Sequence, residues 1–309
     1  MKMQALHAFA EQIADTAVGC RCAPPAALQV RPFVSQRARF LDEPLHFDCT
    51  RYLADVFEAA AFVEPRLLLL DHPRPCEARK ARFVRSDPLL DYARGWDQFG
   101  KLVLSRPSET GEPYGLIAAW KSEEVDRIVS DRRRQNAREA FLGGESFSMT
   151  CGPDLAELES PPGHKVRVYG DDLVDFFPAC DVPREHALTN ALAVRARGRD
   201  FAGTKALAQS GLRPDDPAVP CCGSLVMGNL NATTWAQGSH AGVLRQRPQF
   251  FAAADQACPH RPFPVGPLVQ GLTIDDRIGL AVMPRRMQEL AQAREVFAAG
   301  EELTAAAGL

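Results

Sequence analysis

Two neighbouring carboxylates, Asp275-Asp276, lie between two short apolar runs near the end of the chain. Residues 268–272 and 278–282 each have the length and composition of a short β-strand, and Pro284 follows the second run. This pattern predicts a β-hairpin whose turn carries both acids. An acidic turn is by itself commonly a solvated hairpin tip, so its meaning depends on what accompanies it in the chain.

A second acidic cluster follows residues 164–169, whose alternating apolar side chains predict another strand. It contains Asp171, Asp172 and Asp175. Carboxylates delivered by two strand ends can share a pair of divalent metal ions, the arrangement that nucleotidyl transfer uses. The sequence leaves open whether Asp171 or Asp172 is the ligand, and whether Asp175 assists it or only caps the next turn.

Composition limits the classes of protein that remain. With 309 residues and 46% hydrophobic side chains, the chain can form one large or two ordinary cores. The net charge of −3 excludes a uniformly basic nucleic-acid binder, so a polyanion would be held by local patches. The nine cysteines show no zinc-ligand spacing, which indicates reduced thiols. We find no secretory signal or membrane-length apolar run, and expect an intracellular protein, cytoplasmic or nuclear, without membrane partners.

Apolar periodicity gives a coarse map of the elements. Residues 115–120 and 125–130 predict a β-hairpin with Lys121 at its tip. Residues 71–115, rich in proline and charge, predict loops and short helices, and residues 198–218 an irregular insertion. Helices are predicted at residues 1–19, 51–63, 183–194 and 285–307. We also expect Met227 and Trp235 in the core, and His240 as a packed or capping side chain.

Four short motifs follow one another in a fixed order. They comprise Arg127, Asp131, Arg133 and Asn136; then Asp172, Asp175 and Phe177; then Gly228, Asn231 and Gln237; and last Asp275-Asp276. In this order, over roughly residues 115–285, the chain resembles the reverse transcriptases of retroelements. Two positions depart from the family pattern: Thr273 replaces the aromatic residue before the doublet, and Val226 replaces a proline.

The resemblance implies an α+β fingers–palm fold, with a small antiparallel palm sheet and helices packed on one face. It divides the chain into a helical, loop-rich extension (1–110), a fingers-like hairpin region (111–160) and a palm-like domain (161–309) that stops before the thumb. The implied function is RNA-directed DNA synthesis, with dNTPs added to the primer of an RNA or DNA template. The oligomeric state stays open.

The resemblance also assigns roles to residues. Asp172, Asp275 and Asp276 would be the catalytic carboxylates that hold two Mg²⁺ or Mn²⁺ ions. Lys121 and Arg127 would hold the triphosphate, Phe177 would lie under the sugar, and Gly228 would allow a close backbone approach. Structural or template-side roles fall to Asp131, Arg133, Asn136, Asn231 and Gln237.

Two alternatives remain at this level. The chain could be an inactive retroelement remnant that binds nucleic acid or protein. The stretch Gly170-Asp171-Asp172 also resembles the acidic box of RNA-directed RNA polymerases. That interpretation ranks lower, because it leaves residues 226–237 and the second doublet unexplained.

Overall fold

The computed structural model describes residues 30–38, 40 and 43–309, so the helix predicted at 1–19 lies outside the described residues. The chain divides into two compact units, which we describe separately. The first comprises residues 1–39 and 116–129, and the second residues 40–115 and 130–309. The domain boundaries predicted near residues 110 and 160 stay predictions.

The sheet of the first unit contains the predicted hairpin. Its strand order is β1 (Val30–Arg31), β3 (Gly115–Trp120) and β4 (Asp126–Asp131), and β3 and β4 continue past the unit boundary. Lys121 lies in the turn, where its backbone N–H donates to the carbonyl of Val125 at 3.2 Å. The predicted hairpin and the position of Lys121 are therefore confirmed.

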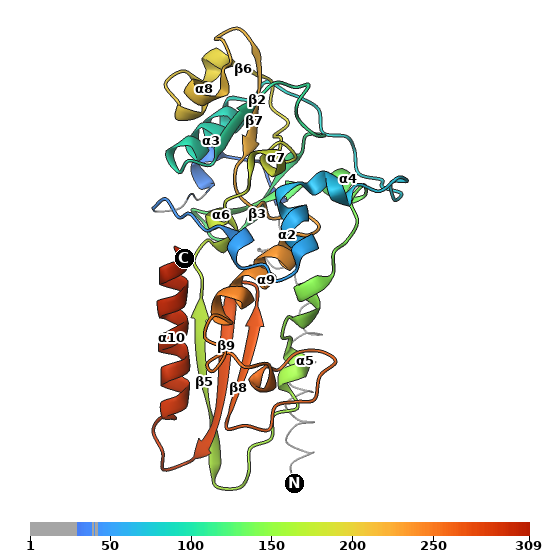
Figure 1. Ribbon diagram of the computed structural model, residues 1–309. Helices are drawn as coiled ribbons and strands as arrows, with labels where there is room; N and C mark the ends of the chain where they lie inside the picture. Colours follow the sequence, from blue (N-terminus) through green and yellow to red (C-terminus); the bar gives the residue numbers. More distant parts are fainter. Residues whose placement is uncertain (1–29, 39, 41–42) are drawn as a thin grey trace, which may run out of the picture. The chain divides into compact units, whose positions relative to one another are not determined.

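An antiparallel sheet near the C-terminal end of the second unit carries both acidic clusters. Its strand order is β5 (His164–Asp172), β9 (Asp276–Pro284) and β8 (Leu268–Thr273), as Figure 1 shows. The predicted β8–β9 hairpin is confirmed with one change. Asp276 is paired within β9, so Ile274 and Asp275 alone separate the two strands.

Two helices accompany this sheet. In Figure 1, α10 (Ala291–Ala307) runs beside β5, and it also contacts α9 (Ala232–Leu244). Leu268, Ala281 and Met283 of the sheet pack with Val296 and Phe297 of α10 in one buried cluster. The helix predicted at 285–307 starts later than expected. Residues 285–287 follow β9 as a turn, in which the N–H of Arg285 donates to the carbonyl of Gly163 and that of Met287 to the carbonyl of Pro284.

A second sheet occupies the other end of this unit. Its order is β2 (Leu102–Ser105), β7 (Pro217–Cys222) and β6 (Ala196–Arg197), accompanied by α3 (Asp87–Gln98) and α8 (Lys205–Ser210). The prediction of loops and short helices over 71–115 is consistent with α3 and wrong for the strand β2. The amphipathic face of α3 buries Leu90, Ala93 and Trp96.

The remaining helical predictions hold in part. The helix predicted at 51–63 is α2 (Val56–Val63), which begins where the Asp55 carboxylate accepts the N–H of Glu58 at 2.8 Å. The prediction at 183–194 is wrong beyond one turn, α7 (Arg184–Ala187), because Ala191 and Leu192 bridge to Cys221 and Tyr114 instead. Short elements complete the unit: η3 (Cys49–Arg51), η4 (Pro65–Leu68), α4 (Arg133–Asn136), η5 (Gly144–Ser148), α5 (Gly152–Leu155), α6 (Phe176–Ala179), η6 (Gly198–Phe201) and η7 (Ala253–Asp255), with η2 (Ser35–Arg37) in the first unit.

The described chain is thus a mixed fold of small antiparallel sheets and helices, which agrees with the predicted α+β class. No helix among the described residues is both long and apolar enough to cross a membrane.

Candidate functional site

The ends of β5 and β9 bring the two acidic clusters together. Asp172 and Asp276 are direct partners in the antiparallel register, and Asp275 precedes Asp276 in the turn. Side chains directly opposite each other in an antiparallel pair lie on the same face of the sheet. Asp172 and Asp276 are exposed there, whereas Asp275 is half-buried. Segments that are distant in sequence therefore place three carboxylates at one edge of the sheet.

Asp171 faces the helices instead. Its register partner is Arg277, and the two side chains form an ion pair of 3.8 Å. Arg277 is 3% exposed, donates to the carbonyl of Val296 on α10 at 3.2 Å, and lies over the ring of Phe297. Because side chains alternate along a strand, Asp172 is the member of the pair that shares a face with Asp276.

Like charges raise the free energy of this strand end. The pKa of Asp275 is raised, first by burial and then by the negative charges of Asp276 and Asp172. Burial also raises the pKa of Asp171, although Arg277 opposes that shift. A group of carboxylates in which one pKa is raised by its neighbours favours the binding of a cation or a proton.

Two side chains of α9 hold the turn that carries Asp275. Ile274 has a positive φ of 60°, a strained conformation for a β-branched residue. Its N–H donates to Gln237 Oε1 at 2.6 Å, and its carbonyl accepts from His240 Nδ1 at 2.7 Å. Gln237 also donates to the carbonyl of Leu272 at 3.2 Å. Both backbone groups of Ile274 are thus satisfied by buried side chains.

The state of His240 is set by burial. Burial lowers the pKa of His240 to about 4, so the ring is neutral at pH 7. A neutral ring that contacts a carbonyl through Nδ1 must carry its proton on that nitrogen. His240 is therefore a donor that positions the turn, a role more specific than the predicted packing or capping one. Gln237 positions the same turn.

Asn136, Gly228 and Asn231 meet in a second hydrogen-bonded region. Asn136 donates to the carbonyl of Gly228 at 2.9 Å and accepts from the N–H of Leu230 at 3.1 Å. Gly228 has φ 109°, which a glycine adopts without strain. Asn231 is completely buried and bonds the backbone of Ala140 and Leu142. These contacts hold the segment before α9 against the segment after α4.

The charged residues of the first motif either pair with each other or are exposed. Arg133 forms a two-point ion pair with Asp131, at 2.7 and 2.8 Å, which lowers the pKa of Asp131. Lys121 and Arg127 are exposed and belong to the first unit, so their predicted roles at the triphosphate stay predictions.

The aromatic and apolar side chains of the motifs give a mixed outcome. Phe177 is half-buried and packs against the cluster that contains Trp235. Trp235 is fully buried, as predicted. Met227 is 37% exposed, so its prediction as a core residue is wrong. Its carbonyl accepts from Ser130, and this fixes the backbone without burying the side chain.

Whether these side chains suit a divalent metal ion depends on the ligand atoms that they supply. Among the described residues, no group of three His, Cys, Asp or Glu side chains is arranged so that it could hold a metal ion. Asp172, Asp275 and Asp276 nevertheless supply the hard oxygen ligands that Mg²⁺ prefers. Mg²⁺ is commonly bound by one or two carboxylates together with substrate phosphates and water. The donor chemistry fits an ion that the substrate helps to hold, and does not form a closed protein cage.

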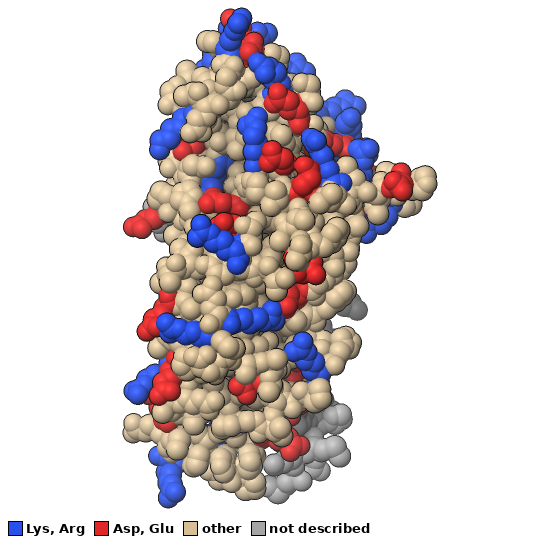
Figure 2. Space-filling view, in the orientation of Figure 1, with Lys and Arg blue, Asp and Glu red and all other residues tan. Residues whose placement is uncertain are grey.

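The surroundings of the strand end combine a cavity with mixed charge. A cavity of about 340 Å³ is bordered by Asp171, Asp172, Arg277 and residues of α9 and α10. On the face shown in Figure 2, the basic and acidic side chains of the described residues are interspersed rather than gathered by sign. Any nucleic-acid contact on that face would therefore depend on local groups of basic residues.

Comparisons with known proteins give little beyond this geometry. No protein-family model and no curated protein matches the chain. A solved structure that is similar is a foamy viral protease-reverse transcriptase in complex with double-stranded DNA. It has 12% identity and a TM-score of 0.43, over 87% of this chain and 44% of that one. The chain thus spans less than half the length of this neighbour, and the likeness is too distant to support an argument.

The sequence missed Arg277 as part of the site. Its signal was the period of two in β9, which places position 277 on the face opposite Asp276 and toward the apolar positions 279 and 281. An arginine on the apolar face of a strand predicts a buried cation, which needs an acid as its partner. Asp171 was an acid at the end of β5 that the metal site did not use.

Proposed function

We propose that this chain is a fingers–palm nucleotidyltransferase that carries out RNA-directed DNA synthesis. The observation that carries the proposal is the register of β5 and β9, which pairs Asp172 with Asp276 next to Asp275. The four motifs in family order supply the reaction type. Lys121 and Arg127 are proposed, from the motif alone, as ligands of the triphosphate.

The proposed reaction requires oxygen ligands that are held in fixed positions at the ends of β5 and β9. A divalent ion bound there would stabilise negative charge on the phosphoryl oxygens during transfer. Asp172 and Asp276 would hold it from adjacent strands, and Asp275 from the turn. Gln237 and His240 would keep Asp275 in place, since they bond both backbone groups of Ile274. Misplacement of a ligand by about 1 Å is expected to cost roughly a hundredfold in rate.

The decisive experiment is Mg²⁺-dependent dNTP incorporation on a primed RNA template. We expect incorporation by the wild type and its loss in Asp275→Ala/Asp276→Ala. The matched control is Glu295→Ala, which removes an exposed acid on α10 that has no ion-pair partner among the described residues, and it should keep wild-type activity. If the wild type adds no nucleotide, the enzymatic proposal is wrong. If the double variant is as active as the wild type, Asp275 and Asp276 are not the catalytic carboxylates.

A second candidate function is binding of nucleic acid without catalysis. The observation that favours it is that no three-residue metal group is formed among the described residues. A fluorescently labelled primer–template separates the two. Binding that is unchanged by Asp275→Ala/Asp276→Ala, together with no incorporation by the wild type, would support a binding protein.

A further inference from the structure

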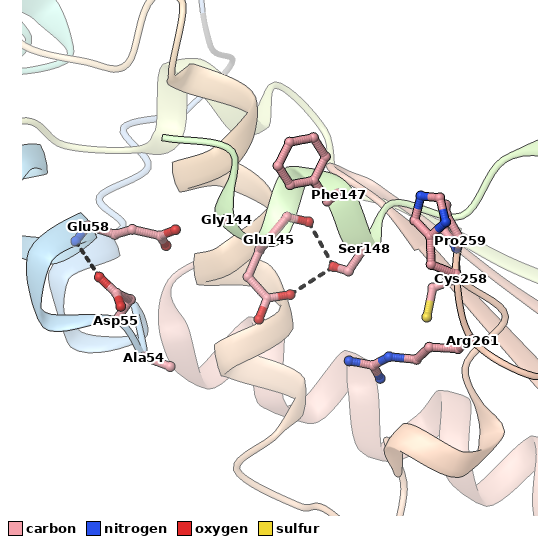
Figure 3. Close-up of a pocket in the computed structure, with 11 residues that line it drawn as sticks. Ala54, Asp55, Glu58, Gly144, Glu145, Phe147, Ser148, Cys258, Pro259 and Arg261 are labelled. Carbon is pink, nitrogen blue, oxygen red and sulfur yellow. Dashed lines mark hydrogen bonds between the residues drawn. The ribbon is translucent and has the colours of Figure 1, made fainter. Parts of the chain in front are cut away.

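A second cavity of the larger unit lies apart from the strand end. It has a volume of about 420 Å³ and is formed by residues 54–58, 144–148 and 258–261 (Figure 3). It shares no lining residue with the cavity that borders Asp171 and Asp172. None of the four sequence motifs contributes to it, so the proposed polymerase chemistry leaves it unexplained.

Glu58 is the unusual group of this cavity. The residue is 7% exposed, and no described residue donates a hydrogen bond or forms an ion pair with its carboxylate. Its Oε1 lies against Gly144, where an added Cβ would collide with it. The pKa of Glu58 is raised by burial first, and then by the charges of Asp55 and Glu145. A carboxylate that faces a cavity and accepts from no described protein group can accept hydrogen bonds from a cationic ligand bound there.

The other acids of the cavity already have partners. Asp55 accepts the N–H of Glu58 at 2.8 Å and starts α2. Glu145 pairs with Arg245 at 2.7 Å and accepts from Ser148 at 2.8 Å, a contact drawn in Figure 3. Glu58 is therefore the acid of this cavity whose carboxylate has no described partner, and the charges of Asp55 and Glu145 would add to the attraction of a cation.

The walls add a second feature suited to a cation. The ring of Phe147 lines the cavity, and this side chain is 65% exposed. An aromatic face attracts an ammonium or guanidinium group, by about 0.5–1 kcal/mol at exposed sites. Arg261 also lines the cavity and forms no ion pair with Glu58. Since no described three-residue group could hold a metal ion, a bare divalent ion fits less well than an organic cation.

We propose that this cavity binds a small organic cation through an ammonium or guanidinium group, which pairs with Glu58 and stacks on Phe147. The cation can belong to a free small molecule or to a Lys or Arg side chain of a peptide. Both sources share this chemistry, and the experiment separates them. The site is independent of the proposed polymerase activity.

Isothermal titration calorimetry with agmatine, a small guanidinium amine, tests the site directly. We expect the wild type to bind agmatine and to ignore its neutral analogue N-butylurea. Glu58→Gln keeps the shape and removes the charge, and should weaken agmatine binding roughly ten- to a hundredfold. Glu295→Gln makes the same charge change on α10 and should leave the affinity unaltered. Parallel titration with N-acetyl-arginine amide shows whether a peptide side chain is preferred.

A second variant keeps the proposal testable if Glu58→Gln fails to fold. Arg261→Gln removes a positive charge from the cavity lining and should tighten agmatine binding severalfold. The proposal is overturned if wild-type protein gives the same heats with agmatine and N-butylurea. It is also overturned if folded Glu58→Gln binds agmatine as tightly as the wild type, or if Arg261→Gln weakens the binding.

Discussion

Adjacent residues at the end of β5 have opposite environments. Asp171 faces the helices and pairs with Arg277, which is buried against α10. Asp172 faces away from them and opposes another acid, Asp276, with both side chains exposed. Charge is neutralised on the first face and left unbalanced on the second. One strand end thus pairs an acid with a buried arginine on one face and presents two exposed, adjacent acids on the other.

The largest expected effect tests which of these two faces carries the chemistry. If the wild type incorporates dNTPs, Asp172→Asn should lower the rate on the order of a hundred- to a thousandfold. Asp171→Asn should stay within a few-fold of wild type, because Asp171 pairs with Arg277 away from Asp276. Primer-extension rates measure both variants. A large loss in Asp171→Asn with none in Asp172→Asn would reverse the assignment of the faces.

The next effect concerns stability on the helix face. Arg277→Ala removes an ion pair, hydrogen bonds to Gln270 and Val296, and the contact with Phe297. We expect a loss of about 3 kcal/mol in the free energy of unfolding, measured by urea denaturation. Arg285→Ala is the control, since this exposed arginine uses only its backbone N–H, and it should change stability by less than about 0.5 kcal/mol. Equal losses in the two variants would contradict the structural role of Arg277.

A pH series tests the turn that joins the two faces. The pKa of His240 is lowered to about 4 from its usual 6.5, so the unfolded chain binds more protons between these values. Stability should therefore fall as the pH drops from 6.5 to 4. His240→Gln does not titrate, and should be less pH-dependent by about 2 kcal/mol over this range. His186 is buried in both proteins, so the difference isolates His240. Parallel curves for the two proteins would show that His240 is not held neutral.

The smallest effect concerns Gln237, which bonds the N–H of Ile274 and the carbonyl of Leu272. Gln237→Ala should cost about 1.5 kcal/mol in thermal or urea unfolding, because it leaves two buried backbone groups without their partner. Gln246→Ala, an exposed position just past α9, should be neutral. If the two variants unfold alike, the turn does not depend on this contact.

The sequence predicted the elements that follow a simple period. Strands β5, β8 and β9 were evident from their alternation and their apolar runs, and so was the hairpin of β3 and β4. It failed at β2, a run of only four residues, and at residues 188–194, where it predicted a helix. In residues 188–194, the backbone of Ala191 and Leu192 pairs with segments that are distant in sequence. Local residue propensities do not predict such pairing.

The sequence by itself determined which carboxylates stand at strand ends and in what order the motifs follow. It could not decide between Asp171 and Asp172, because both are acids in the same strand. Only the tertiary structure showed that Asp172 shares a face with Asp276 and that Asp171 pairs with Arg277, since the face of each side chain depends on the register with β9 and on the position of α10. The same holds for Gln237, His240 and Glu58. Their environments come from contacts between segments far apart in the chain, and burial by those segments sets both their pKa values and their partners.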